Sequence, residues 1–425
     1  MAEIRPFRGI RYNEAAYTDL SPVLAPPYDV ISPAEHKQLR ERSDRNVVQL
    51  ILSDRPASAK GGRDRYARAA QWLDDWLVDE TLLQEQVPAI YLLDQEFKVD
   101  GSPRTRRAFI ARLRLEAFGK GSVFPHEQTM PGPKADRLAL MQATRMNMSQ
   151  VFGLYPDDGA VRPILDAMAE LDPVAEGTGV DGVRNVLRVV YHAKLIGALA
   201  ETLKDKRIVV ADGHHRYETA VAYRDEMRLR RGALNLDRPY EFVSVALVAM
   251  SDPGLVIRAT HRLVAGLGGV TSSVLFQKAA GDFELEEIAP DPAAILARLA
   301  ELADRHAFGI VTHDAARIFI RKTGTRAADG SPEELDTHIL HHRVFSKLLQ
   351  LGADAWRKGG PVRYIQSADE CVDAVQRGDA QLAALVNPTR MDEVEAVALS
   401  GGTMPPKSTF FYPKLPTGLV INPLI

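Results

Sequence analysis

Two adjacent histidines and an arginine stand at a turn between an apolar run and a helical run. The turn is Asp212-Gly213-His214-His215-Arg216. The run Arg207 to Val210 before it predicts a strand, and the run Tyr217 to Arg224 after it predicts a helix. The first backbone N–H groups of such a helix point unpaired toward the turn, where the helix dipole adds positive charge. Arg216 can fork onto phosphate oxygens, and His214 and His215 can donate to them, so the turn predicts a phosphate site.

Two other interpretations of this turn stay open. In the first it is a surface turn, with Asp212 as the helix N-cap and Arg216 in solvent. In the second the adjacent histidines bind a metal, but such side chains point to different sides of a helical turn. No HxxxH spacing or cysteine pair accompanies His214 and His215, so a structural zinc site is not expected and metal ligands stay unassigned.

A second group of reactive side chains lies in the proline-rich loop at residues 124–137. The residues that we single out there are His126, Glu127, Lys134 and Arg137. An imidazole, a carboxylate and two cations are components of proton transfer and phosphate positioning. A solvated loop is an equally open interpretation. A helix is expected after the loop, at 135–146.

Three further places carry candidate site residues. Pro26 and Pro27 stiffen the backbone before Tyr28 and Asp29, and stiff polar loops often carry function. His261 and Arg262 end an apolar run and could return to the same site. The C-terminal stretch 404–415 is aromatic and bracketed by lysines, with Lys407 the one chosen here, so we expect it to be docked near the site.

Composition excludes several classes of protein. The 425 residues are 45% hydrophobic with a net charge of -3, which is typical of a soluble protein and gives no polyanion-binding signature. The basic cluster Arg104 to Arg114 is interpreted as the solvated face of a hairpin. The single cysteine, Cys371, argues for a reducing compartment. No apolar run approaches membrane-spanning length and no leader is evident, so a cytoplasmic location without a membrane partner is expected.

The order of expected elements predicts an α/β fold in more than one domain. Alternating runs at 89–99 and 104–115, joined through Asp100-Gly101, predict a hairpin. A helix is expected at 336–351, with its histidines partly exposed. We place a phosphate-binding domain at 1–265, a second α/β domain at 266–400 and the docked C-terminal segment at 401–425.

The turn at Asp212 to Tyr217 resembles the phosphate-binding motif of the ParB/sulfiredoxin superfamily, especially its form in free-serine kinases. The complete chain resembles an uncharacterised bacterial family often labelled ParB-like. The stretches that carry this resemblance are 5–9, 26–30, 126–129, 134–137, 212–217, 260–262 and 407–414. The resemblance implies a ParB/sulfiredoxin-like nucleotide-binding core. ParB partition proteins add a DNA-reading helix-turn-helix, but no basic recognition helix follows here, so specific DNA binding is not expected.

The first functional hypothesis is therefore a small-molecule phosphotransferase. It would move a phosphoryl group from a nucleotide or pyrophosphate to a small hydroxyl substrate, with free L-serine the best guess, and Mg²⁺ is the expected cofactor. The donor phosphates would be held at the turn by Gly213, His214, His215 and Arg216, together with His261 and Arg262. Asp212 would help to order the turn or bind Mg²⁺ through water. Glu127 or Asp29 would accept the substrate proton, and Lys134, Arg137 and Lys407 would neutralise the transferred charge. No Walker A or kinase glycine-rich loop is present.

Two alternatives come from other classes. One is a nucleotide-gated clamp protein that senses CTP or ATP with the same turn. The other is a hydrolase in which His126 and Glu127 activate water. A homodimer is left open as an assembly.

Overall fold

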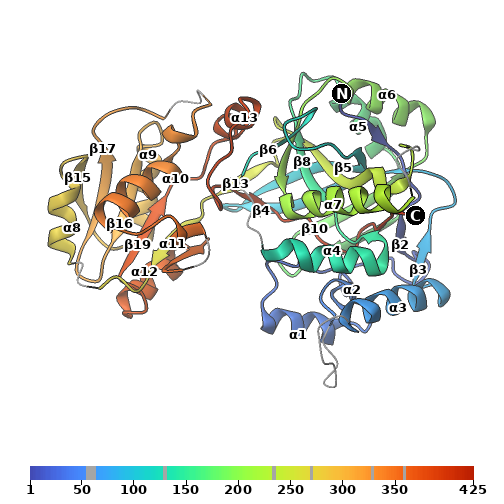
Figure 1. Cartoon of the computed structure of the whole chain (residues 1–425), viewed down its shortest axis with the longest axis horizontal. Helices are drawn as coiled ribbons and strands as arrows, with labels where there is room; N and C mark the ends of the chain where they lie inside the picture. Colours follow the sequence, from blue (N-terminus) through green and yellow to red (C-terminus); the bar gives the residue numbers. More distant parts are fainter. Residues whose placement is uncertain (54–63, 128–131, 232–235, 269–270, 327–329, 358–359) are drawn as a thin grey trace. The chain divides into compact units, whose positions relative to one another are not determined.

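The computed structural model describes residues 1–53, 64–127, 132–231, 236–268, 271–326, 330–357 and 360–425 (Figure 1). The chain divides into two compact units, each described here by itself. The first unit comprises Met1–Pro125, Pro131–Val256 and Pro413–Ile425. The second unit comprises His126–Met130 and Ile257–Tyr412. Each unit therefore includes a short segment that is remote in sequence from the rest of it.

The first unit is built on a nine-stranded mixed sheet in the order β6-β11-β8-β12-β5-β4-β10-β9, with β1 paired to β5. Its strands are β1 (Ile4–Arg5), β4 (Ile90–Val99), β5 (Ser102–Arg114), β6 (Val123–Pro125), β8 (Val151–Tyr155), β9 (Ala175–Thr178), β10 (Arg184–Val190), β11 (Ile208–Asp212) and β12 (Phe242–Ala249). The pairs β6–β11 and β8–β12 are parallel, and the others are antiparallel. Two-stranded sheets are formed by β2 (Ile10–Tyr12) with β3 (Leu82–Gln84), and by β7 (Met146–Asn147) with β21 (Asn422–Pro423).

The helices of the first unit are α1 (Pro33–Arg42), α2 (Val48–Ile51), α3 (Asp64–Val78), α4 (Gly132–Thr144), α5 (Arg162–Ala169), α6 (Ala193–Leu203), α7 (His214–Arg231) and η1 (Pro239–Glu241). Helices α4, α5, α6 and α7 contribute apolar residues to the core that they form with this sheet. In α7, Tyr217, Ala220, Tyr223 and Met227 recur at helical spacing and belong to the main core. Helices α4 and α7 lie side by side (Figure 1).

The hairpin β4–β5 explains how the sheet presents two different faces. Its turn is Asp100-Gly101, and both residues have positive φ, 48° and 77°, as a tight hairpin turn requires. Alternate β5 residues, including Phe109 and Leu113, enter the core. Arg106 points to the other face, where the C-terminal segment lies. The interpretation of 104–114 as a solvated face is therefore wrong for Arg106, which is 0% exposed.

The second unit contains a six-stranded antiparallel sheet in the order β15-β17-β16-β19-β14-β18. Its strands are β14 (His261–Val264), β15 (Phe283–Ile288), β16 (Ala307–Val311), β17 (Ala316–Arg321), β18 (Val362–Ile365) and β19 (Leu382–Val386), while β13 (Val256–Arg258) pairs with β20 (Phe410–Tyr412). The helices are α8 (Ser272–Ala279), α9 (Pro292–Glu301), η2 (Pro332–Glu334), α10 (Asp336–Ile339), η3 (Leu340–Leu348), α11 (Asp354–Arg357), α12 (Ala368–Gln376) and α13 (Met391–Leu399).

Helices cover both faces of this second sheet. Phe308 and Ile310 of β16 pack in one core with α8, α10 and η3, while Ala307 and Val311 pack in another with α9 and α12. Alternation along the strand produces this division. The prediction of an α/β fold is confirmed. The helix expected at 336–351 begins at Asp336 and turns π-helical at Leu340. There the prediction of partial exposure is wrong for His341, which is buried.

Within the described ranges, none of the helices combines the length and the hydropathy that a membrane crossing requires.

Candidate functional site

The histidine turn links β11 to α7 in the first unit. Asp212 ends the strand, Gly213 has φ of 83°, and His214 is the first helical residue. The positive φ favours glycine here, and a Cβ on Gly213 would lie 2.7 Å from Nε of Arg216 and displace that guanidinium. The structure therefore has the strand, turn and helix expected from the sequence. Asp212 lies one residue too early to be the N-cap.

Asp212 is held in its ionised form by the cations around it. One carboxylate oxygen accepts the Gly213 N–H at 2.7 Å, and the other contacts Nζ of Lys414 at 2.9 Å. Arg216 lies 3.8 Å away. Burial by itself raises the pKa of Asp212, but the charges of Lys414 and Arg216 outweigh it and hold that pKa well below its ordinary value. The turn thus contains a fixed negative charge between two cations.

Arg216 is anchored on the segment that precedes β8. Its Nη1 donates to the Gln150 carbonyl and lies 3.4 Å from Oγ of Ser149. The side chain is only 11% exposed. Arg216 is therefore fixed by protein contacts, and it lies at the edge of a pocket as well as beside Asp212.

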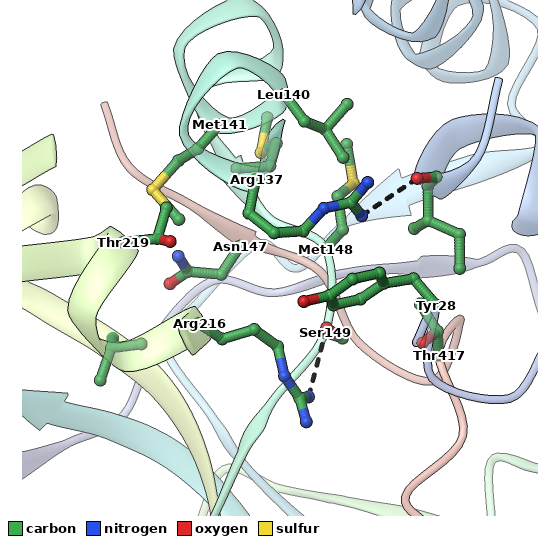
Figure 2. Close-up of a pocket in the computed structure, with 13 residues that line it drawn as sticks. Tyr28, Arg137, Leu140, Met141, Asn147, Met148, Ser149, Arg216, Thr219 and Thr417 are labelled. Carbon is green, nitrogen blue, oxygen red and sulfur yellow. Dashed lines mark hydrogen bonds between the residues drawn. The ribbon is translucent and has the colours of Figure 1, made fainter. Parts of the chain in front are cut away.

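This pocket lies within the first unit and encloses about 510 Å³ of empty space, part of it open to solvent (Figure 2). It is lined by Tyr28, Ile51, Arg137, Leu140, Met141, Met146, Asn147, Met148, Ser149, Arg216, Thr219, Val243 and Thr417. Arg137 donates to the Ile51 carbonyl at 3.1 Å, and its guanidinium lies 4.0 Å from the centre of the Tyr28 ring. Two arginines beside an apolar, methionine-rich wall suit a ligand that joins an anionic group to an apolar part.

Other residues predicted for the site occupy less central positions in the first unit. Nζ of Lys134 lies 3.9 Å from Glu218 on α7. His214 and His215 are half-buried at the start of that helix. Asp29 is exposed, and its neighbour Tyr28, which the sequence analysis did not choose, lines the pocket.

A second group of predicted residues meets in the second unit. Nε2 of His126 lies 2.7 Å from Oγ1 of Thr409. Oε1 of Glu127 accepts the Lys407 N–H at 2.8 Å, and Arg262 donates to the Lys407 carbonyl at 3.1 Å. These contacts fix the backbone of the segment around Lys407, whose side chain is exposed.

His261 and Arg262 are buried components of the same unit. Nδ1 of His261 accepts the Val386 N–H at 3.2 Å, and burial lowers the pKa of His261 to about 4. The ring is thus neutral near pH 7 and has its Nδ1 acceptor in use. Burial lowers the pKa of Arg262 to about 10, and its guanidinium lies 5.4 Å from the Tyr364 ring centre. Both side chains contact protein groups of the sheet and the C-terminal segment.

The residues predicted for one site therefore divide between two units. The first unit holds Asp29, Lys134, Arg137, Asp212, Gly213, His214, His215 and Arg216, and the second holds His126, Glu127, His261, Arg262 and Lys407. Thr129, which belonged to the expected reactive loop, lies outside the described residues.

The sequence analysis also did not choose Lys414, which pairs with Asp212, or Arg106, which donates to the neighbouring Pro413 carbonyl. The signal for Lys414 was present, because lysines bracket both ends of the aromatic stretch, but only Lys407 was chosen. Arg106 gave no signal, since it sits among other arginines in a strand with alternating polarity.

A protein-built metal site is not evident in the described ranges, where histidine, cysteine and acidic side chains do not gather in groups of three or more that could hold an ion.

Comparison with curated proteins found no match. Among solved structures, the chain is similar to a conserved hypothetical protein from Pyrococcus furiosus at 13% identity and a TM-score of 0.35, covering 70% of this chain and 90% of that one. It is similar to a mutant of a free serine kinase in complex with ADP at 13% identity and a TM-score of 0.35, covering 68% and 84%. C-terminally truncated SbnI from Staphylococcus aureus matches at 13% identity and a TM-score of 0.35, covering 71% and 84%. Similarity of this extent carries no functional conclusion. Residues 4–338 match the family described as "Protein of unknown function (DUF1015)", and the chain belongs to that family.

Proposed function

We propose that this protein is a phosphotransferase that moves a phosphoryl group from a nucleotide or pyrophosphate to a small hydroxyl substrate, with free L-serine the first acceptor to test. The observation that carries the proposal is the turn Asp212 to Arg216, which opens α7 beside a pocket lined by Arg137 and Arg216. Backbone N–H groups at a helix start and fixed guanidinium groups are a recurrent phosphate-binding combination.

The local charge balance supports an anionic ligand. Lys414 and Arg216 both lie within 4 Å of Asp212. The carboxylate cancels one of the two positive charges, so the three groups together keep one net positive charge. The guanidinium of Arg137 lines the adjoining pocket, where Asp136 is its partner. Phosphoryl transfer relies mainly on positioning and charge neutralisation, which such fixed cations supply.

Mg²⁺ fits this site as an ion carried on the donor phosphates. Magnesium usually keeps several waters and takes one or two carboxylates together with substrate phosphates. Asp212, ionised at the turn, is the carboxylate that would contact its hydration shell. The bound ion would neutralise charge on the donor.

Transfer to a hydroxyl substrate also needs a group that accepts the hydroxyl proton, and a carboxylate can do so. Asp29 is the exposed carboxylate beside the pocket residue Tyr28. Glu127 has one oxygen committed to the Lys407 N–H. We propose Asp29, and Asp29→Asn is the variant that tests it, with Glu127→Gln of the second unit as the comparison.

Phosphorus NMR of the purified protein tests the reaction. The protein is incubated with Mg²⁺, a pool of small hydroxyl compounds including L-serine, and ATP, ADP or pyrophosphate. AMP is added as a nucleotide that has no phosphoanhydride bond and so cannot act as such a donor. A new phosphate monoester signal is the expected result. Nucleotide binding without transfer would favour the clamp protein, and phosphate release without transfer would favour the hydrolase.

Calorimetric titration tests the site itself. Arg216→Ala is expected to weaken donor binding by roughly tenfold to a hundredfold, because a charge-assisted pair at the turn is lost. Arg230→Ala is the matched control, since Arg230 lies on the same helix, is 69% exposed and pairs with Glu226. Equal affinities for Arg216→Ala and wild type would exclude the turn as the phosphate site.

A further inference from the structure

Lys414 reaches Asp212 from a segment that is two hundred residues away in sequence, so something must hold that segment in place. Arg106 of β5 does so from inside the first unit. Its Nη2 donates to the Pro413 carbonyl at 2.6 Å and also to the side-chain oxygen of Gln95. The guanidinium lies 4.7 Å from the centre of the Phe152 ring. The residue before Lys414 is therefore fixed to a central strand of the sheet.

Gln95 of β4 fixes the next peptide group. Its Nε2 donates to the Lys414 carbonyl at 3.2 Å and to Oδ1 of Asn185 at 2.9 Å. Asn185 of β10 in turn donates to the Val183 carbonyl at 3.0 Å. Both Gln95 and Asn185 are buried. Three neighbouring strands thus contribute to one polar chain that ends on the backbone of Pro413 and Lys414.

Arg106 is a costly residue to place here if packing were its only role. It is 0% exposed, and within the described chain its Nε and Nη1 have no hydrogen-bond partner. Burial lowers the pKa of Arg106 to about 9, although the more distant charges of Asp252, Asp212 and Asp181 oppose that effect. A well-packed apolar side chain is often as stable as a buried ion, so this arginine calls for a reason other than stability.

We propose that Arg106 is a positioning residue of the phosphate site, acting with Gln95 to fix the backbone of Pro413 and Lys414 so that the Lys414 ammonium lies at the histidine turn. The role in ligand binding rests on the proposed function. The role in placing Lys414 does not. Strands of a central sheet hold a group more rigidly than a loop, which suits a cation that must meet a phosphate at a fixed place.

Chemical labelling tests the placement directly. Arg106→Met keeps the volume and removes the two donated hydrogen bonds. The acylation rate of each lysine with sulfosuccinimidyl acetate is followed by peptide mass spectrometry on the full chain. Lys414, now 19% exposed and paired with Asp212, is expected to react about fivefold faster or more in Arg106→Met, because a freed ammonium loses its partner. An unchanged rate at Lys414 would overturn the proposal.

Arg107→Met is the matched control. Arg107 is the next residue of β5, points to the opposite face and pairs with Asp94 and Asp166. The variant Arg107→Met removes an arginine from the same strand and leaves the hydrogen bonds of Pro413 and Gln95 intact. The acylation rate of Lys414 in Arg107→Met should equal that of wild type. A rise equal to that in Arg106→Met would mean general loosening of the sheet and would also overturn the proposal.

A double-mutant cycle tests whether Arg106 acts through Lys414. Pyrophosphate and ADP are titrated into wild type, Arg106→Met, Lys414→Met and the double variant. Each single change is expected to weaken binding about tenfold, and the double variant should be no weaker than Lys414→Met alone. Additive losses would show that Arg106 does not work through Lys414.

The experiments also cover a variant that does not fold and a wild-type protein that does not bind the ligands. If Arg106→Met does not fold, Gln95→Leu replaces it. That variant removes the Gln95 hydrogen bonds to the Lys414 carbonyl, Asn185 and Arg106, leaves the Arg106 bond to the Pro413 carbonyl, and should also accelerate Lys414 acylation. If wild type binds neither pyrophosphate nor ADP, the proposed function fails, and the acylation rates still decide whether Arg106 places Lys414.

Discussion

Lys407 and Lys414 bracket one aromatic stretch, and each is held by a buried arginine, but the two lysines end in opposite situations. In the second unit, Arg262 holds the Lys407 carbonyl, Glu127 holds its N–H, and the side chain is exposed. In the first unit, Arg106 holds the carbonyl before Lys414, and the ammonium itself lies on Asp212. The contacts of Lys407 are made by its backbone, whereas the contact of Lys414 with Asp212 is made by its charged side chain.

The difference teaches that a lysine near a motif is not by itself a site residue. Lys407 has φ of 61°, a left-handed conformation that directs both of its peptide groups to partners in the second unit. Lys414 is the one whose ammonium pairs with a carboxylate at the histidine turn. Four predictions test this contrast, in order of decreasing effect.

Truncation of either buried arginine should give the largest effect. Arg106→Ala and Arg262→Ala each leave a cavity, and each leaves the carbonyl that the arginine bound without its donor. Each should therefore lower the free energy of unfolding by about 3 to 5 kcal/mol. Hydrogen exchange measured by mass spectrometry should locate the loss in β4, β5 and β10 for Arg106→Ala, and in β14, β18 and β19 for Arg262→Ala. Identical exchange maps would remove the contrast between the two units.

Acid should destabilise the second unit before the first. The pKa of His261 is lowered by burial from 6.5 to about 4 in the folded state. The unfolded chain therefore takes up the proton first, and stability is lost as pH falls from about 6.5 toward 4, by about 3 kcal/mol in full and about 2 kcal/mol by about pH 5. Asp212 has the opposite shift, since its pKa lies below the ordinary 3.8, and its contribution is lost only at lower pH.

The measurement for this prediction is urea unfolding at about pH 7 and pH 5, with hydrogen exchange followed in peptides of each sheet. His261→Asn is the control, because its side-chain oxygen can accept the Val386 N–H without titrating in this range. A pH response that persists in His261→Asn would assign the effect to another group.

Neutralising the two lysines should affect ligand binding unequally. Lys414→Met removes a cation at the histidine turn and is expected to weaken pyrophosphate binding about tenfold, whereas Lys407→Met should change it by less than about twofold. Calorimetric titration at low and moderate salt measures both. A larger loss of pyrophosphate affinity in Lys407→Met than in Lys414→Met would show that Lys407, and not Lys414, contacts the phosphate.

The smallest effect is expected from glycine at the same two positions. Lys407→Gly relieves a left-handed backbone and should raise the free energy of unfolding by about 0.5 kcal/mol. Lys414→Gly loses the ion pair with Asp212 and should lower it. Thermal unfolding of both variants and of Lys407→Ala, which keeps the strain, checks the sign. Stabilisation by Lys407→Ala as well would point to the charge of Lys407 instead of its conformation.

Local features were predictable because local physics decides them. The strand, Gly213 and the helix after it follow from an apolar run, a residue suited to positive φ and helical spacing, all adjacent in sequence. The hairpin at Asp100-Gly101 follows in the same way. The α/β class follows from the order of such elements.

The composition of the site was less predictable, since it depends on which elements meet. Arg137 was chosen from its loop, and it lines the pocket with Arg216. His126 and His261 were chosen for their chemistry, and the fold buries both in the second unit. A single site was expected because the residues share chemical type, which carries no information on distance.

The sequence by itself determined the histidine turn, the hairpin and the presence of reactive groups in the C-terminal stretch, since each is encoded by neighbouring residues. Only the tertiary structure decided that Arg106 is buried and that Lys414, not Lys407, supplies a charge to Asp212. The physical reason is that strand alternation fixes which side chains share a face but not what covers that face. Here residues more than three hundred positions away cover it, and their carbonyl groups turn an apparently exposed arginine into a buried donor.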